Sequence, residues 1–251
     1  MLNRFTNQVA IITGGADGIG KGIAQRLASE GATVVLFDIN HVQLERTVAD
    51  FSKQGFTASG HVVDVSQESG VEKAMQTVAE TLGRLDIMIN SAGILGPTNT
   101  KITDYSAADY DRVYHTNLRG AFLMTKYALK VMEKANYGRI LHLASIAGKE
   151  GNPFMTGYSS MKAGVIGLVK GIGKEYAETG ITVNGLAPAV ISTAMNQDTA
   201  PEQLAYMTAK IPMKRLGTVE EVAAMAAWIV SEEASFSTGF IFDLSGGRAT
   251  Y

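Results

Sequence analysis

Tyr158 and Lys162 are four positions apart in a segment with helical periodicity, so one face of a helix is expected to present both side chains. A phenol whose pKa is lowered by a nearby ammonium can exchange a proton with an alcohol or ketone oxygen. Spacing alone does not establish this role, because Tyr206 and Lys210 repeat the pattern. Tyr158 is favoured because Ser145 closes an apolar, strand-like run, whereas no strand precedes Tyr206.

Two further polar residues belong with this pair. The Ser145 hydroxyl is expected at the carboxyl edge of a sheet, where it can hydrogen-bond a reacting oxygen and stabilise developing charge. Asn117 is a poor helix former inside an apolar, helix-like stretch, so its amide is either exposed or holds a water that passes protons to Lys162. Asn117, Ser145, Tyr158 and Lys162 are the candidate catalytic residues.

A glycine-rich turn follows the first strand-like run. Gly14, Gly18 and Gly20 permit a tight turn, close approach of a pyrophosphate and close helix packing, and the next helix directs its N-terminal amides at the anion. Asp38 ends the following strand, where its carboxylate can accept hydrogen bonds from both hydroxyls of an adenosine ribose. A 2′-phosphate would meet like charge there, so NAD is favoured over NADP. The alternative is that Asp38 only caps the next helix.

Other strand ends reach the same expected crevice. Asp64 and Val65 are candidates for contact with adenine, and Asn90, Ala92 and Gly93 are candidates for contact with cofactor ribose. Each of these segments by itself is also consistent with an ordinary turn.

These residues are positioned by alternating short apolar runs and longer amphipathic segments. Strands are predicted at Val9–Thr13, Thr33–Phe37, Ala58–Val63, Asp86–Asn90, Arg139–Ala144, Thr182–Ala187 and Phe240–Leu244. Helices are predicted at approximately 18–30, 41–53, 67–82, 106–134, 157–178 and 219–231. The pattern is typical of an α/β, single-domain Rossmann-type fold over residues 1–251, a doubly wound sheet of about seven parallel strands with helices on both faces. The proline-containing segment 188–218 interrupts it and is expected to form a substrate-loop lid, with a short helix at 201–210.

Composition restricts the remaining classes of function. The 251 residues carry a formal net charge of −2, so nucleic acid and anionic membranes are not expected partners. Cysteine is absent, which excludes disulfides, thiolate metal sites and a cysteine nucleophile. No metal site, signal peptide or apolar run of membrane-spanning length is expected, and the expected location is cytoplasmic.

In the order of its motifs, the whole chain resembles a classical short-chain dehydrogenase/reductase. The motifs are Thr13-Gly14-x-x-x-Gly18-x-Gly20, Asp64, Asn90-Ser91-Ala92-Gly93, Asn117-x-x-Gly120, Ser145, Tyr158-x-x-x-Lys162 and Asn184 to Pro188. The resemblance implies hydride transfer at the nicotinamide C4, with Tyr158 as acid/base, Ser145 positioning the substrate oxygen and Asn117 supporting a proton relay. It also implies that Lys162 binds the nicotinamide ribose.

The resemblance extends to further contacts and to assembly. It implies that Asp17 and Ile19 line the cofactor turn and that Pro188 lies against the nicotinamide. It also implies that the carboxamide is contacted by the backbone of Val190 and by the hydroxyl of Ser192 or Thr193, of which Thr193 is favoured. It further implies a homotetramer paired through the helices around 106–134 and 157–178.

The substrate is expected to bind among the loops 94–104, 146–157 and 189–215. Their polar character suits a small hydroxylated molecule. The candidate substrate contacts are Ser145, Lys149, Glu150, Asn152, Tyr158, Met195 and Arg248. Most of the charges are equally consistent with solvated loop residues, and Arg248 is expected either to reach a neighbouring subunit's site or to pair at an interface.

Three interpretations of the function follow. Segments 147–153 and 245–251 are similar to those of bacterial members that oxidise sugars or 2-keto-3-deoxy sugar acids. The alternative enzyme is a 3-oxoacyl carrier-protein reductase, whose usual NADP preference conflicts with Asp38. A third interpretation, a catalytically silent NAD-sensing protein, is opposed by the complete set of catalytic candidates.

Overall fold

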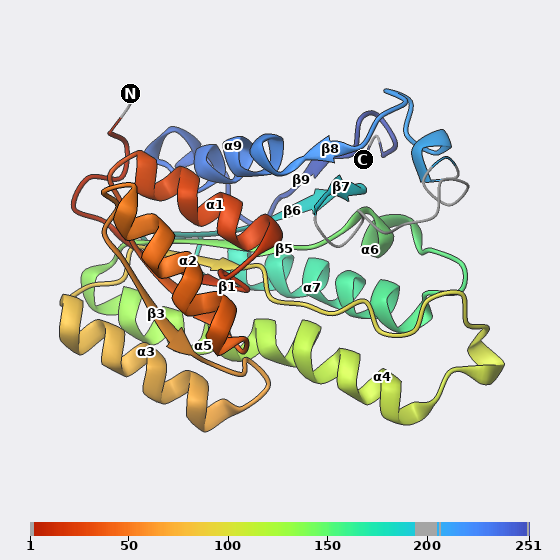
Figure 1. Cartoon of the computed structure of the whole chain (residues 1–251), viewed down its shortest axis with the longest axis horizontal. Coiled ribbons are helices and arrows are strands. Elements are labelled where there is room, and N and C mark those ends of the chain that lie inside the picture. The colour runs from red at the N-terminus through yellow and green to blue at the C-terminus, as the bar shows by residue number, and fades with distance from the viewer. Residues whose placement is uncertain (1–2, 194–204, 206, 250) are drawn as a thin grey trace.

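The computed structural model describes residues 3–193, 205, 207–249 and 251 (Figure 1). Seven strands form one sheet in the order β3-β2-β1-β4-β5-β6-β9, and every neighbouring pair is parallel. The strands are β1 (Val9–Thr13), β2 (Thr33–Asp38), β3 (Ala58–Val62), β4 (Ile87–Asn90), β5 (Gly138–Leu143), β6 (Ile181–Pro188) and β9 (Ile241–Leu244). The predicted doubly wound α/β sheet is confirmed.

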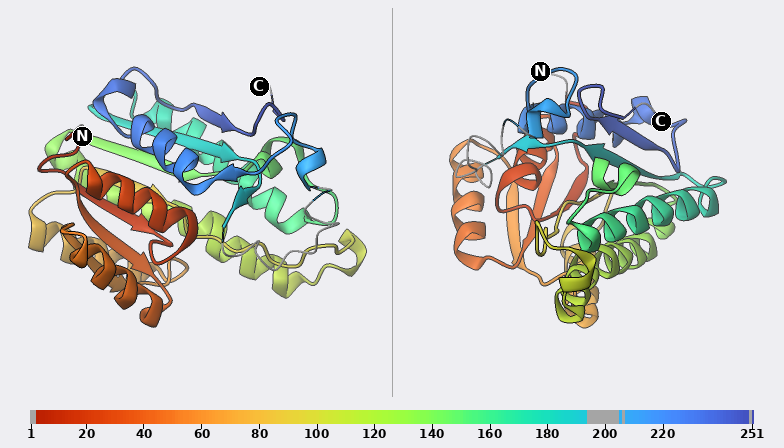
Figure 2. Two further views of the ribbon diagram at one scale, coloured as in Figure 1. Left: turned by 45° about the horizontal axis from the view of Figure 1, so that its top comes forward. Right: turned by 90° about the vertical axis from the view of Figure 1, so that its right-hand side faces the viewer.

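Helices cover both faces of the sheet (Figure 2). One apolar cluster joins alternate strand residues to α1 (Gly18–Ser29), α2 (His41–Lys53) and α9 (Val219–Ile229). A second cluster on the opposite face takes residues from α3 (Glu68–Leu82), α5 (Gly120–Met132) and the end of α7 (Thr156–Glu175). The central strands β1, β4, β5 and β6 are buried on both sides because helices cover both faces, which explains their nearly continuous apolar sequences, whereas the edge strand β3 is largely exposed.

The helix expected over 106–134 contains a change of winding. It is divided into α4 (Ala107–Tyr114), a π-helical turn η2 (His115–Arg119) and α5. A π turn adds one residue to the helical circuit and turns the side chains around it to a new direction. The turn carries Asn117, which is 1% exposed. Asn117 is therefore not the exposed helix residue that the sequence left as one alternative.

The carboxyl end of the sheet collects the loops that follow the strands (Figure 1). The short helix α6 (Ile146–Glu150) follows β5 directly. Two short parallel strands, β7 (Ile191–Ser192) and β8 (Gly217–Thr218), pair the two ends of the expected lid segment. Residues 207–209 are helical, whereas Met195 and residues 201–204 and 206 of the predicted helix at 201–210 lie outside the described residues. None of the helices described here is long and apolar enough to cross a membrane.

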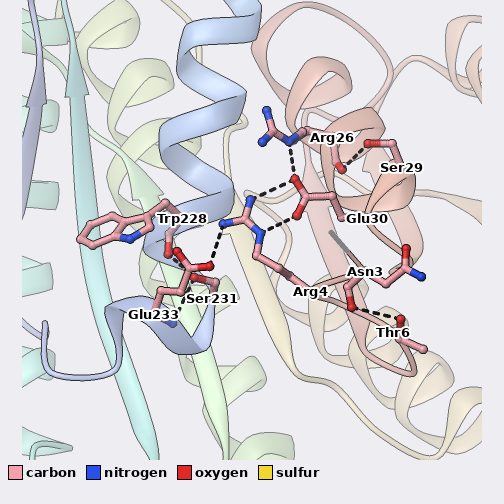
Figure 3. Close-up of polar contacts among 9 residues, drawn as sticks. All are labelled: Asn3, Arg4, Thr6, Arg26, Ser29, Glu30, Trp228, Ser231 and Glu233. Carbon is pink, nitrogen blue, oxygen red and sulfur yellow. Dashed lines mark hydrogen bonds and ion pairs between the residues drawn. The ribbon is translucent and has the colours of Figure 1, made fainter. Parts of the chain in front are cut away.

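A cluster of charged residues lies near the amino ends of the strands (Figure 3). Glu30, directly after α1, accepts hydrogen bonds from Arg4 Nε at 2.5 Å and Nη2 at 2.9 Å, and from Arg26 Nε at 2.5 Å. Burial alone would raise the pKa of the Glu30 carboxyl, but the hydrogen bonds from Arg4 and Arg26 outweigh it and lower the pKa. Arg4 also lies 3.7 Å from Glu233, so the cluster joins the N-terminal segment, α1 and the segment after α9.

Candidate active site

The glycine turn between β1 and α1 has the shape expected for a pyrophosphate cradle. Gly14 and Gly18 have φ angles of +62° and +53°, which favour glycine strongly. A Cβ on Gly20 would lie 2.1 Å from the Gly14 carbonyl oxygen, so the helix can approach the turn this closely only with glycine there. Asp17 caps α1 by accepting a hydrogen bond from Gly18 N at 2.7 Å. The first-turn amides, among them those of Ile19 and Gly20, have no partner within an ideal helix and are suited to an anion.

Asp38 ends β2 beside this turn, and its carboxylate is held in place by backbone amides. Oδ2 accepts from Ala16 N at 3.1 Å and Oδ1 accepts from Asn40 N at 2.9 Å. The cap of α2 is Asn40, whose side chain accepts from Gln43 N at 3.1 Å. The alternative that Asp38 only caps the next helix is therefore wrong. Each carboxylate oxygen retains a lone pair with which it can accept from a ribose hydroxyl.

The expected adenine loop is braced against the π turn. Asp64 Oδ1 accepts from Ser66 N at 2.9 Å, which closes the loop after β3. The Arg119 guanidinium hydrogen-bonds the Ser66 carbonyl oxygen. Val65 is buried against Gly120, where an added Cβ would come within 2.9 Å of Val65 Cγ2. The loop and the turn therefore form one packed unit.

Thr13 organises the loop after β4. Its Oγ1 accepts from Ser91 N and from Ala92 N, each at 3.0 Å, and donates to Asn90 Oδ1 at 3.2 Å. The side chain of Asn90 is thus held against Thr13 and is buried. The backbone amides of Ser91 and Ala92 lie at the carboxyl end of β1, where Thr13 binds them. A Cβ on Gly93 would lie 3.3 Å from Asn117 Oδ1 and 3.7 Å from Lys162 Nζ, so this loop passes directly over the catalytic candidates.

Tyr158 and Ser145 lie together at the carboxyl end of β5. Ser145 caps α6, and its Oγ accepts from Ala147 N at 3.1 Å. Tyr158, in the first turn of α7, is partly buried and hydrogen-bonded to Ser145. Burial raises the pKa of Tyr158, and the hydrogen bond with Ser145 offsets only part of this effect. The result differs from the lowered pKa that the Tyr158–Lys162 spacing predicts.

Lys162 is itself buried beside Tyr158. Its Nζ lies 5.6 Å from the centroid of the Tyr158 ring and donates to the Leu143 carbonyl oxygen at 2.6 Å. The ladder between β4 and β5 ends with the pair Asn90 and His142, so the ammonium binds a carbonyl one residue beyond it. Burial lowers the pKa of Lys162 to about 8, so a growing fraction of the amine loses its proton and its charge as the pH rises above neutral.

Asn117 contributes through the loop after β4. Its Oδ1 accepts from Ile94 N and its Nδ2 donates to Ile94 O, both at 2.8 Å. Each end of the amide keeps one further site, the second hydrogen of Nδ2 and the second lone pair of Oδ1, so the relay water at Asn117 stays a prediction. The observed role of the side chain is to fix Ile94 and, with it, the position of Gly93.

The charged substrate candidates pair within the chain. Lys149 Nζ lies 3.4 Å from Asp243 Oδ2, and its side chain is only 7% exposed. Arg248 donates to Glu150 Oε2 at 2.8 Å and to Asn152 Oδ1 at 3.1 Å. Tyr251 contacts the same group of residues, because its hydroxyl donates to the Lys149 carbonyl oxygen at 2.9 Å. Within this arrangement neither Lys149 nor Arg248 offers an unpaired charge to a ligand.

The expected nicotinamide loop begins at the end of β6. Pro188 is opposite Leu244 in the β6–β9 register, and Val190 O accepts from Gly217 N at 3.1 Å. Thr193 follows β7 and is partly exposed. Met195, the remaining substrate candidate, lies outside the described residues.

Two features of the site were not predicted. The sequence gives no indication that the Leu143 carbonyl holds Lys162, because backbone acceptors carry no residue-type signal. His142, fully buried behind the site, was also missed. A lone histidine in the apolar run Arg139–Ala144 was a signal that could have identified it.

Comparisons with known proteins agree with this geometry. Residues 14–249 match the family model described as "Enoyl-(Acyl carrier protein) reductase". The 2-dehydro-3-deoxy-L-rhamnonate dehydrogenase (NAD(+)) of Sphingomonas sp. (strain SKA58) is 44% identical over 250 residues, covering 99% of this chain and 98% of the relative.

A further relative and a solved structure also match nearly the whole chain. The 3-oxoacyl-(acyl-carrier-protein) reductase FabG of Thermotoga maritima (strain ATCC 43589 / DSM 3109 / JCM 10099 / NBRC 100826 / MSB8) is 34% identical, covering 97% of this chain and 98% of the relative. A crystal structure of NAD+-bound xylitol dehydrogenase superposes with a TM-score of 0.92 at 30% identity, covering 97% of this chain and all of the other.

Proposed function

Since the chain belongs to the classical short-chain dehydrogenase/reductase family, we propose that Tyr158 is its acid/base residue, with Ser145 and Lys162 positioned to assist. The protein is an NAD-dependent oxidoreductase that interconverts a secondary alcohol and a ketone on a small polar substrate. The observation that carries the assignment of roles is that Tyr158 and Ser145 meet at the carboxyl end of β5 beside the buried Lys162, whose Nζ lies 5.6 Å from the centroid of the Tyr158 ring.

The chemistry divides between the cofactor and the chain. Bound NAD supplies the hydride acceptor for the carbon of the alcohol. Tyr158 takes the hydroxyl proton in oxidation and returns it in reduction, and the Ser145 hydroxyl donates to the oxygen as negative charge develops there. Lys162 supplies positive charge near the phenol and binds the nicotinamide ribose.

The cofactor is held by groups that fit it. The glycine turn and the first turn of α1 receive the pyrophosphate, and Asp38 accepts from the adenosine ribose. Asp64 and Val65 border the adenine, while Asn90, Ala92, Gly93, Pro188, Val190 and Thr193 border the nicotinamide riboside. The carboxylate of Asp38 disfavours the 2′-phosphate of NADP, which also argues against a 3-oxoacyl carrier-protein reductase.

The substrate we propose is a sugar or a 2-keto-3-deoxy sugar acid. The support is the 44% identity to a dehydrogenase named for 2-dehydro-3-deoxy-L-rhamnonate. Segment 188–218 is the proposed lid, because β7 and β8 join its two ends next to the nicotinamide loop.

The test is turnover with a panel of substrates. The protein is mixed with NAD and with sugars, sugar acids, polyols or a 3-hydroxyacyl thioester, and the reduced cofactor is followed by its absorbance. Oxidation of a sugar or sugar acid supports the proposal, and preferential oxidation of the thioester favours the alternative. NAD binding without any turnover would sink the enzyme assignment and leave the silent NAD-sensing protein.

Replacement of the acid/base residue gives the matched control. Tyr158→Phe removes only the hydroxyl, so turnover should fall by about 10³-fold or more while the affinity for NAD is retained. Isothermal titration measures the affinity and absorbance measures turnover. Substantial activity in the variant would refute the role of Tyr158.

Assembly and location belong to the same proposal. We expect a homotetramer paired through α4, α5 and α7, since Tyr110, Tyr114 and Phe122 are large exposed side chains on the first two helices. Gly167 and Gly171 leave open space on α7 that lets another helix approach closely. Light scattering of the protein and of Phe122→Lys tests this, and an unchanged mass in the variant contradicts it. Cell fractionation tests the proposed cytoplasmic location.

A further inference from the structure

His142 is a fully buried histidine directly behind the catalytic candidates. It lies on β5, where the parallel register places it beside Asn90 of β4 and Gly185 of β6. Its side chain points to the face covered by α5, because Nε2 lies 2.9 Å from Thr125 Oγ1. Burying an imidazole among apolar residues is costly unless both ring nitrogens find partners.

The contacts of Thr125 fix the tautomer of the ring. The Thr125 hydroxyl has one proton, and it donates that proton to the Ala121 carbonyl oxygen at 2.7 Å. His142 Nε2 must therefore carry a hydrogen and donate it to Thr125 Oγ1. This leaves Nδ1 as an acceptor, and it has no hydrogen-bond partner among the residues that the structure describes.

Lys162 is the charged group that acts on this ring. It donates to the carbonyl of Leu143, the residue next to His142. Burial and then the charge of Lys162 lower the pKa of His142 to about 3, so the imidazole is neutral under working conditions. Lys162 forms no ion pair in the described part of the chain, and the other titratable group beside it is Tyr158 on its own helix.

We propose that His142 is a positioning residue for Lys162, acting through an internal water that donates to Nδ1 and accepts from the Lys162 ammonium. A buried polar atom without a protein partner is a usual site for such a water. A second acceptor besides the Leu143 carbonyl would hold the ammonium in place and favour its charged form. The inference rests on the proposed role of Lys162 in assisting Tyr158.

The principal test compares two replacements of His142. His142→Leu removes the acceptor, so Lys162 loses part of its charge and the phenolate of Tyr158 is less stabilised. The acid limb of the pH profile of kcat/KM for alcohol oxidation should then move to higher pH by about 0.5–1 unit. His142→Asn retains an acceptor and should keep the limb close to that of the unsubstituted protein. An active His142→Leu protein with an unshifted limb overturns the proposal.

A second variant guards against misfolding of the first. Thr125→Val removes the group that fixes the tautomer, so it should move the limb in the same direction by a smaller amount. Thr182 is also a buried threonine, on β6, so Thr182→Val is the matched control. It should leave the acid limb of the pH profile of kcat/KM at the same pH. Equal limbs in both threonine variants count against the proposal.

A readout without turnover separates this inference from the proposed function. Nitrogen NMR of the labelled protein should show His142 as a neutral ring protonated at Nε2 with a hydrogen-bonded Nδ1, and a crystal structure should show a water at Nδ1. Protonation at Nδ1, or a dry Nδ1, overturns the inference even in an active enzyme. Absence of turnover with the expected NMR pattern would instead count against the proposed function.

Discussion

Two cations of low exposure, Arg4 and Lys162, have opposite kinds of partner in this protein. Arg4, with a side chain 14% exposed, meets the Glu30 carboxylate through two hydrogen bonds at the amino end of the sheet (Figure 3). Lys162, 6% exposed at the carboxyl end, meets only the carbonyl of Leu143 among the described hydrogen-bond partners. The first cation has its charge neutralised locally, and the second does not.

The difference separates a structural from a chemical use of charge. Opposite charges at hydrogen-bond distance keep each other ionised, and breaking such a pair leaves a buried charge without compensation. A buried ammonium that faces only dipoles has its pKa lowered, here to about 8, and responds to small changes around it. Stability should therefore depend on the first cluster and turnover on the second.

The largest expected effect is on turnover in Lys162→Met. Methionine keeps much of the apolar volume but removes the charge, so kcat for alcohol oxidation should fall by about 10³-fold or more. Because the lost ammonium had no carboxylate partner, the melting temperature should stay the same or rise. Stopped-flow absorbance and calorimetry measure the two quantities. A variant that is chiefly destabilised would erase the distinction between the clusters.

The opposite pattern is expected for Glu30→Gln. Loss of the carboxylate removes the counter-charge of Arg26 and leaves Arg4 only the more distant Glu233, at 3.7 Å, so the free energy of unfolding should fall by about 3 kcal/mol. Values of kcat and KM at a temperature where the variant remains folded should match those of the unsubstituted protein. Denaturant titration measures the loss. A decrease in kcat without loss of stability would contradict it.

The contribution of Glu30 to stability should also depend on pH. The pKa of Glu30 is lowered in the folded protein, so its contribution to stability is complete above the ordinary carboxyl pKa and is lost as the pH falls through the lower, folded value. Glu30→Gln should therefore narrow the difference in stability from the unsubstituted protein as the solution is acidified. Denaturant titrations at several pH values measure it, and a constant difference would show that the carboxylate charge is not responsible.

The smallest effect is expected at the exposed member of the cluster. Arg26 has a side chain 39% exposed, so Arg26→Ala should cost about 0.5–1 kcal/mol because solvent already screens its pairing with Glu30. The same denaturant titration measures this loss, and added salt should reduce the difference. A loss as large as that of Glu30→Gln would mean that Arg26, and not Arg4, carries the pairing.

The sequence was sufficient for the sheet and for the place of the site. Alternating apolar runs and amphipathic segments specify a parallel sheet because both faces of each strand must be covered, and Ser145, Asp38 and the glycine turn follow strand ends. The position of a residue at a strand end can therefore be predicted from the amino-acid sequence alone.

What the sequence could not specify depends on contacts between distant segments. The π turn at Asn117 pairs with Ile94, and Arg248 meets Glu150 across 98 positions of the chain. Neither partner is marked by local periodicity, since a charged loop residue has the same signature whether it binds a ligand, solvent or another loop. The pKa of Tyr158 was mispredicted for the same reason, because burial depends on the whole fold.

The pairing of β7 with β8 has a consequence for how such a protein can diversify. Ile191 opposite Gly217 and Ser192 opposite Thr218 hold together the two ends of the segment proposed as a lid, so the chain between them is closed into a loop by strand pairing. Lengthening a closed loop adds little to its closure entropy, about 0.6 kcal/mol for each doubling. Insertions and deletions there can leave β6 and α9 in place. The pairing thus lets the proposed lid change in length while the strands and helices that position the proposed cofactor-site and acid/base residues stay unchanged.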